Sequence, residues 1–170
     1  MKKYLLALLI LSMITLSCRR QPVSVVNDDD ATGRVVVKLD GTVVFDKSFG
    51  DDFYWFKSQD VISFHYIENG DTILAGAISH LPPLHTTYPL VDTTGTTVPT
   101  NIILKGNPDK LFTPDQKPFY RMQAAQGTIS HPGEKTFHAE GQCLVWHSED
   151  IPDYTLYDFE LDVDVAKVVE

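Results

Sequence analysis

The segment DFELDVDV, residues 158–165, alternates strictly between acidic and apolar residues. Successive side chains of a β-strand point to opposite faces, so this alternation predicts a strand rather than a helix. One face should lie in the core and the other in water. The predicted core face consists of Phe159, Leu161, Val163 and Val165. The predicted solvent face consists of Asp158, Glu160, Asp162 and Asp164.

The same period of two recurs from Gly33 onward, interrupted by turn residues. Asp40-Gly41 and Asn69-Gly70 each separate two apolar runs and are strong hairpin signals. A third turn is expected at Pro132-Gly133-Glu134. We therefore predict an all-β fold, either an antiparallel β-sandwich or a flattened barrel, with about eight to ten strands.

Only one segment outside the N-terminus resembles the start of a helix. Thr113-Pro114-Asp115-Gln116 fits a capping box with proline at the first helical position. Pro118 would then remove a backbone donor inside the helix. We expect at most one helical turn there, besides the signal segment described next.

The N-terminus has the layout of a secretory signal. Lys2 and Lys3 precede an uncharged, mostly apolar run over residues 4–16, and the small residue Ser17 follows. The run is too short to span a bilayer as a helix, which takes roughly 20 residues. Residues 1–17 are therefore predicted to be a cleaved signal peptide.

Thr15-Leu16-Ser17-Cys18 resembles the lipobox of bacterial lipoproteins, roughly Leu-(Ala/Ser)-(Gly/Ala)-Cys. It departs from that pattern at Thr15 and Leu16. The resemblance implies that the Cys18 sulfur takes a diacylglycerol and that its amine, exposed by cleavage, is acylated. Three acyl chains would hold the protein stably on a membrane without a spanning helix. The alternative is an ordinary secretory signal with an incidental Cys18.

The predicted mature protein is a lipid-anchored domain on a tether. Residues 18–32 comprise the lipidated cysteine and a polar, flexible tether, and residues 33–170 form a single β-domain. Arg19 stands where an aspartate would signal retention in the inner membrane, which favours the outer membrane of the cell envelope. The chain carries a net charge of −9, and loss of Lys2 and Lys3 makes it −11. Such a surface repels phosphate backbones, so nucleic acid is excluded as a partner.

This layout is similar to that of small uncharacterised lipoproteins of Bacteroidota that contain a β-domain. The resemblance covers the signal and the segment from Gly127 to Gly141, which holds a Gly-x-Ile hairpin followed by a glycine-containing strand. That family carries no assigned activity. The same group of bacteria O-glycosylates Asp-Thr-Thr motifs, which makes Thr93 an expected glycosylation site.

Aromatic residues are the candidate ligand-binding residues. Trp146 shares a predicted strand face with Glu140 and Gln142, and such a ring beside amides and carboxylates is suited to stacking on a sugar. Tyr154 and Tyr54 are the other candidates. The alternative is that the long segment 81–100 covers Trp146.

Motifs for catalysis or metal binding are lacking. The histidines lack the close spacing of a metal site, and no Gly-x-Ser-x-Gly nucleophile motif occurs. Cys143 lies between apolar residues of one strand face and is expected to be a buried, inert thiol. We expect no catalytic residues, no metal and no cofactor.

These observations favour a non-enzymatic binding or structural module, anchored to the membrane and facing an envelope protein or a glycan. A glycan-binding accessory lipoprotein is one alternative, and a hydrolase with an unfamiliar motif is another.

Overall fold

The computed structural model describes residues 32–50, 53–90, 99–149 and 153–169. Those residues form eleven strands and one 3₁₀ turn, Lys57–Gln59. The strands are β1 (Gly33–Leu39), β2 (Thr42–Phe49), β3 (Tyr54–Phe56), β4 (Val61–Glu68), β5 (Asp71–Ser79), β6 (Thr87–Pro89), β7 (Asn101–Gly106), β8 (Arg121–Gly133), β9 (Thr136–Trp146), β10 (Tyr154–Asp164) and β11 (Lys167–Val169).

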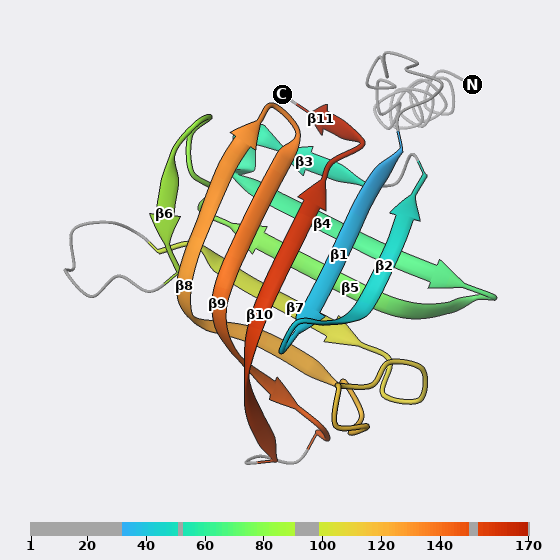
Figure 1. Ribbon diagram of the computed structural model, residues 1–170. Helices are drawn as coiled ribbons and strands as arrows, with labels where there is room; N and C mark the ends of the chain where they lie inside the picture. The colour runs from blue at the N-terminus through green and yellow to red at the C-terminus, as the bar shows by residue number, and fades with distance from the viewer. Residues whose placement is uncertain (1–31, 51–52, 91–98, 150–152, 170) are drawn as a thin grey trace, which may run out of the picture.

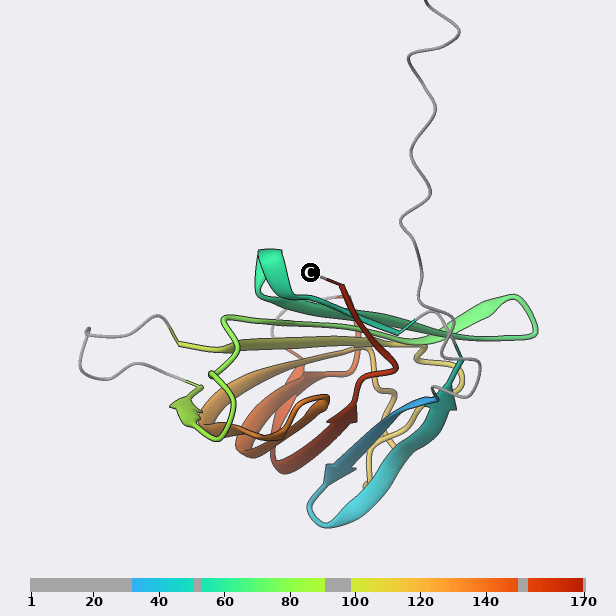
Figure 2. The same cartoon turned by 90° about the horizontal axis from the view of Figure 1, so that it is seen from above.

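All eleven strands belong to one sheet that curls into a half-barrel. Its order is β11-β3-β4-β5-β7-β8-β9-β10-β1-β2, with β6 paired to β8 off this path. Every pairing is antiparallel except that of β11 with β3. Strands β4, β5 and β7 cross behind β8, β9, β10, β1 and β2 at a steep angle (Figure 1), and the view from above shows the two layers (Figure 2). The predicted all-β class is confirmed.

Strand β8 carries the sheet from one layer into the other. Its first residues pair with β7, from Arg121 to Gln123, and its later residues Thr128 to Ser130 pair with β6. The ladder to β9 contains a register shift between Ala124 and Gln126. An extra residue of this kind is a β-bulge, which bends a strand and increases its twist. The bulge therefore helps β8 to pass from one layer of the sheet into the other.

The two hairpin signals are confirmed. Asp40 and Gly41 have φ of 47° and 73°, and Asn69 and Gly70 have φ of 54° and 87°. Two consecutive residues with positive φ characterise the type I′ turn, which matches the twist of the flanking strands. The third turn lies later than expected, at residues 134–135, and Gly133 still pairs with Thr136.

The segment with the capping-box sequence forms a tight non-helical turn. The Thr113 hydroxyl donates to Asp115 Oδ1 at 2.7 Å, and its oxygen accepts the Lys117 backbone N–H at 3.1 Å. Gln116 has φ of 63°, which no right-handed helix contains. The threonine side chain bonds locally to the backbone and stabilises this alternative to a helix.

The alternation predicted for residues 158–165 is confirmed. Its four apolar side chains are at most 2% exposed, whereas Asp158 and Asp164 are exposed and Glu160 and Asp162 are half-buried. Strand β10 lies between β1 and β9, so its backbone is paired on both sides. Its apolar face packs in the single core between the layers, together with aromatic rings such as Phe49, Phe53 and Phe64.

Among the residues that the structure describes, there is no helix long and apolar enough to cross a membrane.

Candidate functional site

A trough crosses the outward face of β8, β9 and β10. Two cross-strand rows of outward side chains form its walls, because the ladder pairs both Gln126 and Asp158 with Gln142 and both Thr128 and Glu160 with Glu140. Its volume is about 590 Å³, and Gly41 of the β1–β2 turn also lines it. A volume of this size lies within the range of small-ligand sites.

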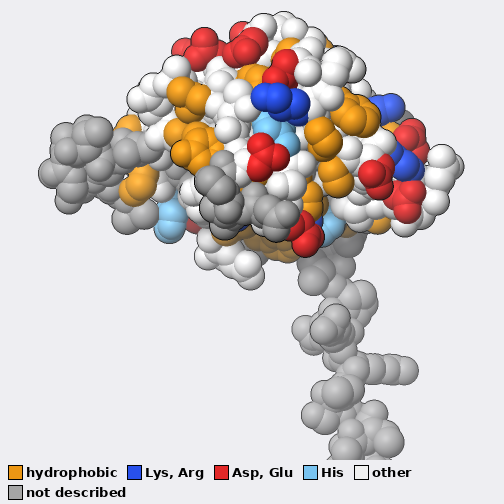
Figure 3. All heavy atoms as spheres, turned by 90° about the horizontal axis from the view of Figure 1, so that it is seen from below, with side chains coloured by type: hydrophobic (Ala, Val, Ile, Leu, Met, Phe, Trp, Pro, Cys, Tyr) orange, Lys and Arg blue, Asp and Glu red, His pale blue; other side chains and the backbone are white. Residues whose placement is uncertain are grey.

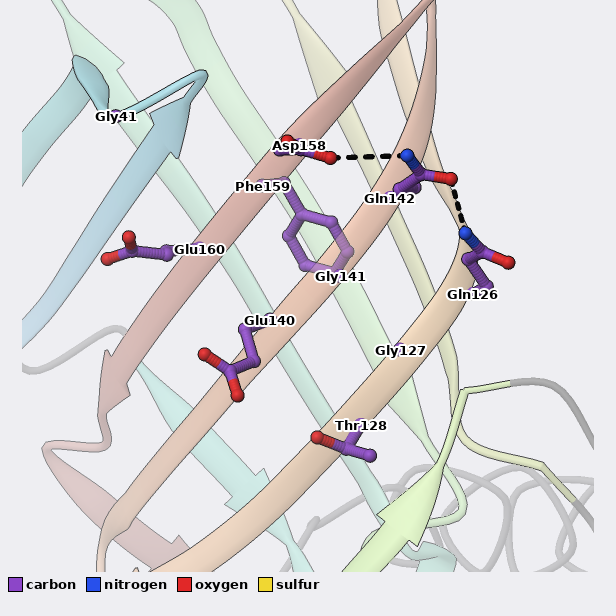
Figure 4. A pocket seen from close by; sticks show the side chains of 10 residues that line it. All are labelled: Gly41, Gln126, Gly127, Thr128, Glu140, Gly141, Gln142, Asp158, Phe159 and Glu160. Carbon is purple, nitrogen blue, oxygen red and sulfur yellow. Dashed lines mark hydrogen bonds between the residues drawn. The ribbon is translucent and has the colours of Figure 1, made fainter.

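The floor of the trough is a pair of glycines. Gly127 and Gly141 lie opposite each other on β8 and β9, between the two rows of side chains (Figure 4). They have φ of 128° and 149°, and a Cβ on either would come within about 2.1 Å of a carbonyl oxygen of the neighbouring strand. Phe159, directly opposite Gly141 on β10, is 2% exposed and fills the inner side of the floor. Glycine at these two positions therefore lets the backbones of β8 and β9 approach each other closely beneath the trough.

One wall is a chain of hydrogen bonds. The Gln126 amide donates to Gln142 Oε1, and the Gln142 amide donates to Asp158 Oδ1 at 3.2 Å (Figure 4). The backbone N–H of Asp158 donates to Asp40 Oδ1 at 3.0 Å, which joins this wall to the β1–β2 turn. These bonds orient the amides, so the wall is ordered before any ligand arrives.

The opposite wall carries two carboxylates. Lys38 Nζ lies 2.6 Å from Glu160, and this hydrogen bond raises the pKa of Lys38. Glu140 Oε2 lies 3.7 Å from His138 Nε2, and the other ring nitrogen of His138 lies 2.6 Å from Asp162. Lys38 offsets the charge of Glu160, whereas Glu140 and Asp158 leave the trough with an excess of negative charge.

Trp146 and Tyr154, two of the predicted ligand-binding residues, lie together on the same outward face. Their ring centroids are 5.9 Å apart, and the Arg121 guanidinium lies 5.2 Å from the centre of the indole. These ring contacts of Trp146 involve β8 and β10 and not the segment 81–100, of which residues 91–98 lie outside the described structure. Tyr154 is 49% exposed, so the pair is open to a partner.

The aromatic pair is separate from the trough. Leu144 and Leu156 form the row between them, and Leu156 is 51% exposed. Figure 3 views the molecule from the end where the β9–β10 hairpin turns, and hydrophobic side chains lie there among charged ones. The outward face therefore combines a polar trough with an apolar patch farther along the same strands.

Tyr54 does not join this face. It lies on β3 in the other layer, where it pairs with Ser63 of β4 and Lys167 of β11. The centroid of its ring lies 5.9 Å from that of Phe56. Thr93 and Cys18 lie outside the described residues.

Sequence reasoning missed the trough, although one signal pointed to its floor. The turn at residues 134–135 alone would pair Gly127 with Gln142, and a register shift between Ser130 and Gly133 places Gly127 opposite Gly141. With the turn expected at Pro132 to Glu134, the glycines would have fallen out of register. A strand glycine of this kind marks a place where another group can approach the backbone closely.

A second polar cluster closes the end of the barrel. His147 Nδ1 lies 3.0 Å from the Pro118 carbonyl, and its Nε2 lies 2.8 Å from Thr155 Oγ1. Lys117 Nζ donates to Thr155 Oγ1 at 3.2 Å and pairs with Asp115 at 3.0 Å. Both ring nitrogens of His147 are already bonded, and the residue is 7% exposed. We interpret this cluster as a hydrogen-bonded link that holds segment 107–120 against the β9–β10 hairpin.

Asp115 lies at the centre of that hydrogen-bonded link. The Tyr157 hydroxyl donates to Asp115 Oδ1 at 2.6 Å. This bond, with those from Thr113 and Lys117, holds the pKa of the Asp115 carboxyl well below its usual range. Burial, with this carboxylate nearby, raises the pKa of Tyr157.

We expect the stabilisation by Asp115 to disappear in acid. A carboxyl with a lowered pKa in the folded state stabilises the fold above its unfolded pKa of about 3.9, and this is lost as the pH falls through the folded pKa. The difference in unfolding free energy between the wild type and Asp115→Asn should therefore be constant from neutral pH to about pH 5 and shrink below about pH 4. Urea unfolding across this range measures it. A difference that stays the same down to pH 2.5 would contradict the bonding described.

The remaining polar residues of interest are buried. Cys143 is 0% exposed, which confirms its predicted burial, and burial raises the pKa of its thiol to about 12, which disfavours the reactive thiolate. His131 is 3% exposed and bonds through Nδ1 to the Pro82 carbonyl at 3.0 Å. Within the described ranges, no three histidine, cysteine or acidic residues are placed to hold a metal ion.

Comparisons with protein-family models, curated proteins and solved structures found no match to this chain.

Proposed function

We propose that this protein is a non-enzymatic binding module of the cell envelope and that the trough on the outward face of β8, β9 and β10 is its binding surface. The observation that carries the proposal is the trough floored by Gly127 and Gly141. Its polar walls are held in place by hydrogen bonds, which is the preorganisation that a recognition site needs.

The side chains at the trough support binding rather than catalysis. Its lining consists of amides, carboxylates, one hydroxyl and one buried phenyl ring. Cys143, the thiol in the described part of the chain, is buried in the core. His147 contacts Thr155, and both residues take part in the hydrogen-bonded link between segment 107–120 and the β9–β10 hairpin. An unrecognised hydrolase would need an activated nucleophile or free carboxylates around the scissile bond, whereas Asp158 and Glu160 already accept hydrogen bonds from Gln142 and Lys38.

The anchor belongs to the same proposal. Cys18→Ala should abolish incorporation of radiolabelled fatty acid and release the protein from the membrane fraction, because the acyl chains provide the membrane affinity. Cys143→Ala is the matched control and should leave both lipid labelling and membrane retention unchanged. Continued labelling and retention of Cys18→Ala would overturn the lipoprotein proposal and return Cys18 to an incidental role.

The binding surface can be tested by cosedimentation of residues 19–170 with envelope fragments of the producing cells. Gln142→Trp fills the trough with an indole ring and should abolish sedimentation with the fragments. Gln123→Trp makes the same change on the same outward face of β8, outside the trough, and should leave sedimentation unchanged. Equal behaviour of the two variants would exclude the trough as the binding surface.

A glycan-binding accessory lipoprotein is the second candidate, and the Trp146–Tyr154 pair favours it. The Tyr154 ring is exposed and the Trp146 ring is half-buried, and together they offer a stacking surface of the kind that sugars use. Arg121 over Trp146 stiffens this platform.

A further inference from the structure

The walls of the trough present mainly hydrogen-bond acceptors. Carboxylates accept only, and Asp158, Glu140 and Glu160 contribute three of them. The amide nitrogens of Gln126 and Gln142 each use one of their two N–H groups within the wall, and Gln126 Oε1 remains as a further acceptor. Acceptor oxygens therefore outnumber the donors that remain on the two amides and the Thr128 hydroxyl. A ligand that satisfies this lining must carry several donors, which a chain of hydroxyl groups provides.

The floor allows that ligand to approach the backbone. The outward side chains form the two walls, and between them the floor consists of the closely approaching backbones of β8 and β9 at Gly127 and Gly141 (Figure 4). The trough crosses three strands and reaches the β1–β2 turn, which corresponds to about 14 Å at about 4.8 Å per strand spacing. Its walls are two residues apart along each strand, or about 7 Å. These proportions suit one extended chain better than a compact ligand.

The charge of the trough decides between classes of sugar. Glu140 is 65% exposed and has no lysine or arginine partner among the described ion pairs, and Asp158 accepts only an amide there. An acidic sugar would bring its carboxylate or sulfate against these groups, and like charges at close range oppose binding. An uncharged polyhydroxy chain meets no such repulsion.

We infer that the trough binds one extended chain of an uncharged oligosaccharide and rejects acidic oligosaccharides. This inference rests on the proposed function, because it takes the trough on the outward face of β8, β9 and β10 as the binding surface. The carboxylates act as acceptors for vicinal hydroxyl groups, and the glycine floor receives the chain. Glu140 sets the discrimination against acidic sugars.

The test uses the full-length lipidated protein in detergent micelles and a panel of hexasaccharides, studied by titration calorimetry. The uncharged probes are cellohexaose, maltohexaose, mannohexaose and xylohexaose, and the acidic probe is hexagalacturonate. At least one uncharged probe should bind, and hexagalacturonate should not. Gln142→Ala should weaken binding about tenfold or more, since it removes a wall amide that orients Asp158. Gln123→Ala, on the same face outside the trough, should leave the affinity unchanged.

Glu140→Gln provides the second readout. It keeps the shape of the wall and removes the carboxylate that has no lysine partner, so the variant should still bind the uncharged probe and should gain measurable binding of hexagalacturonate. Binding of no uncharged probe would overturn the inference. So would wild-type binding of hexagalacturonate as tight as that of the uncharged probes, or equal affinities of Gln142→Ala and Gln123→Ala. If the sugars fail but cosedimentation still depends on Gln142, the binding surface stands and only the class of ligand is wrong.

Discussion

Gly141→Ala is expected to lower the free energy of unfolding by at least about 3 kcal/mol, because the new Cβ is strained by the backbone and has no space. Gly141 has φ of 149°, and its Cβ would lie 2.1 Å from the Gln126 carbonyl oxygen and 2.6 Å from Gly127 Cα. Both atoms belong to the backbone of β8, so β8 and β9 would have to move apart at Gly127 and Gly141 to make room for the Cβ. Chemical denaturation of the purified domain measures the loss.

Two other glycines separate the causes of that loss. Gly41 also has a positive φ, of 73°, but nothing lies within 4 Å of a Cβ there, so Gly41→Ala should cost only about 1–2 kcal/mol. Gly50 has open space and needs no positive φ, and Gly50→Ala should change stability by less than about 0.5 kcal/mol. A Gly141→Ala variant as stable as Gly41→Ala would show that the strands do not approach each other closely at the trough.

Leu161→Ala should cost about 2–5 kcal/mol through lost burial and a cavity in the core. Leu161 is 1% exposed and lies on β10, which is paired on both sides, so the surrounding backbone cannot easily collapse into the space. The neighbouring change Asp162→Ala should alter stability by less than about 0.5 kcal/mol. Asp162 is half exposed and contacts His138 at 2.6 Å, a surface pair of small energetic value. If urea unfolding showed equal losses of stability for the two variants, Leu161 would not face the core and Asp162 would not face solvent as described.

The features that sequence patterns predicted are local ones. The facing of β10 follows from alternation within eight residues, and the Asp40-Gly41 and Asn69-Gly70 turns follow from the φ values that two residues must adopt. Trp146 and Tyr154 meet because they belong to one hairpin and the same face. Each of these structures is determined by neighbours along the chain, so a single sequence is enough to predict it.

The features that escaped prediction depend on pairing between distant segments. Tyr54 was grouped with Trp146 for its chemistry alone, but β3 pairs with β4 and β11 in the opposite layer, and no local pattern encodes that pairing. The trough depends on the register of β8 against β9, and the misplaced turn concealed it.

The position of β1 has a consequence for how the chain folds. β1 lies between β2, its immediate successor, and β10, which pairs Arg34 with Asp164 near the far end of the described chain. The first hairpin can form as soon as its own residues are available, but its second neighbour arrives only after nearly the whole domain has been made. Contacts of such large sequence separation slow folding, since the loop must close before any contact stabilises it. Until β10 arrives, the β1 edge stays open to other strands, and a folding catalyst or chaperone that shields it would raise the yield of native protein.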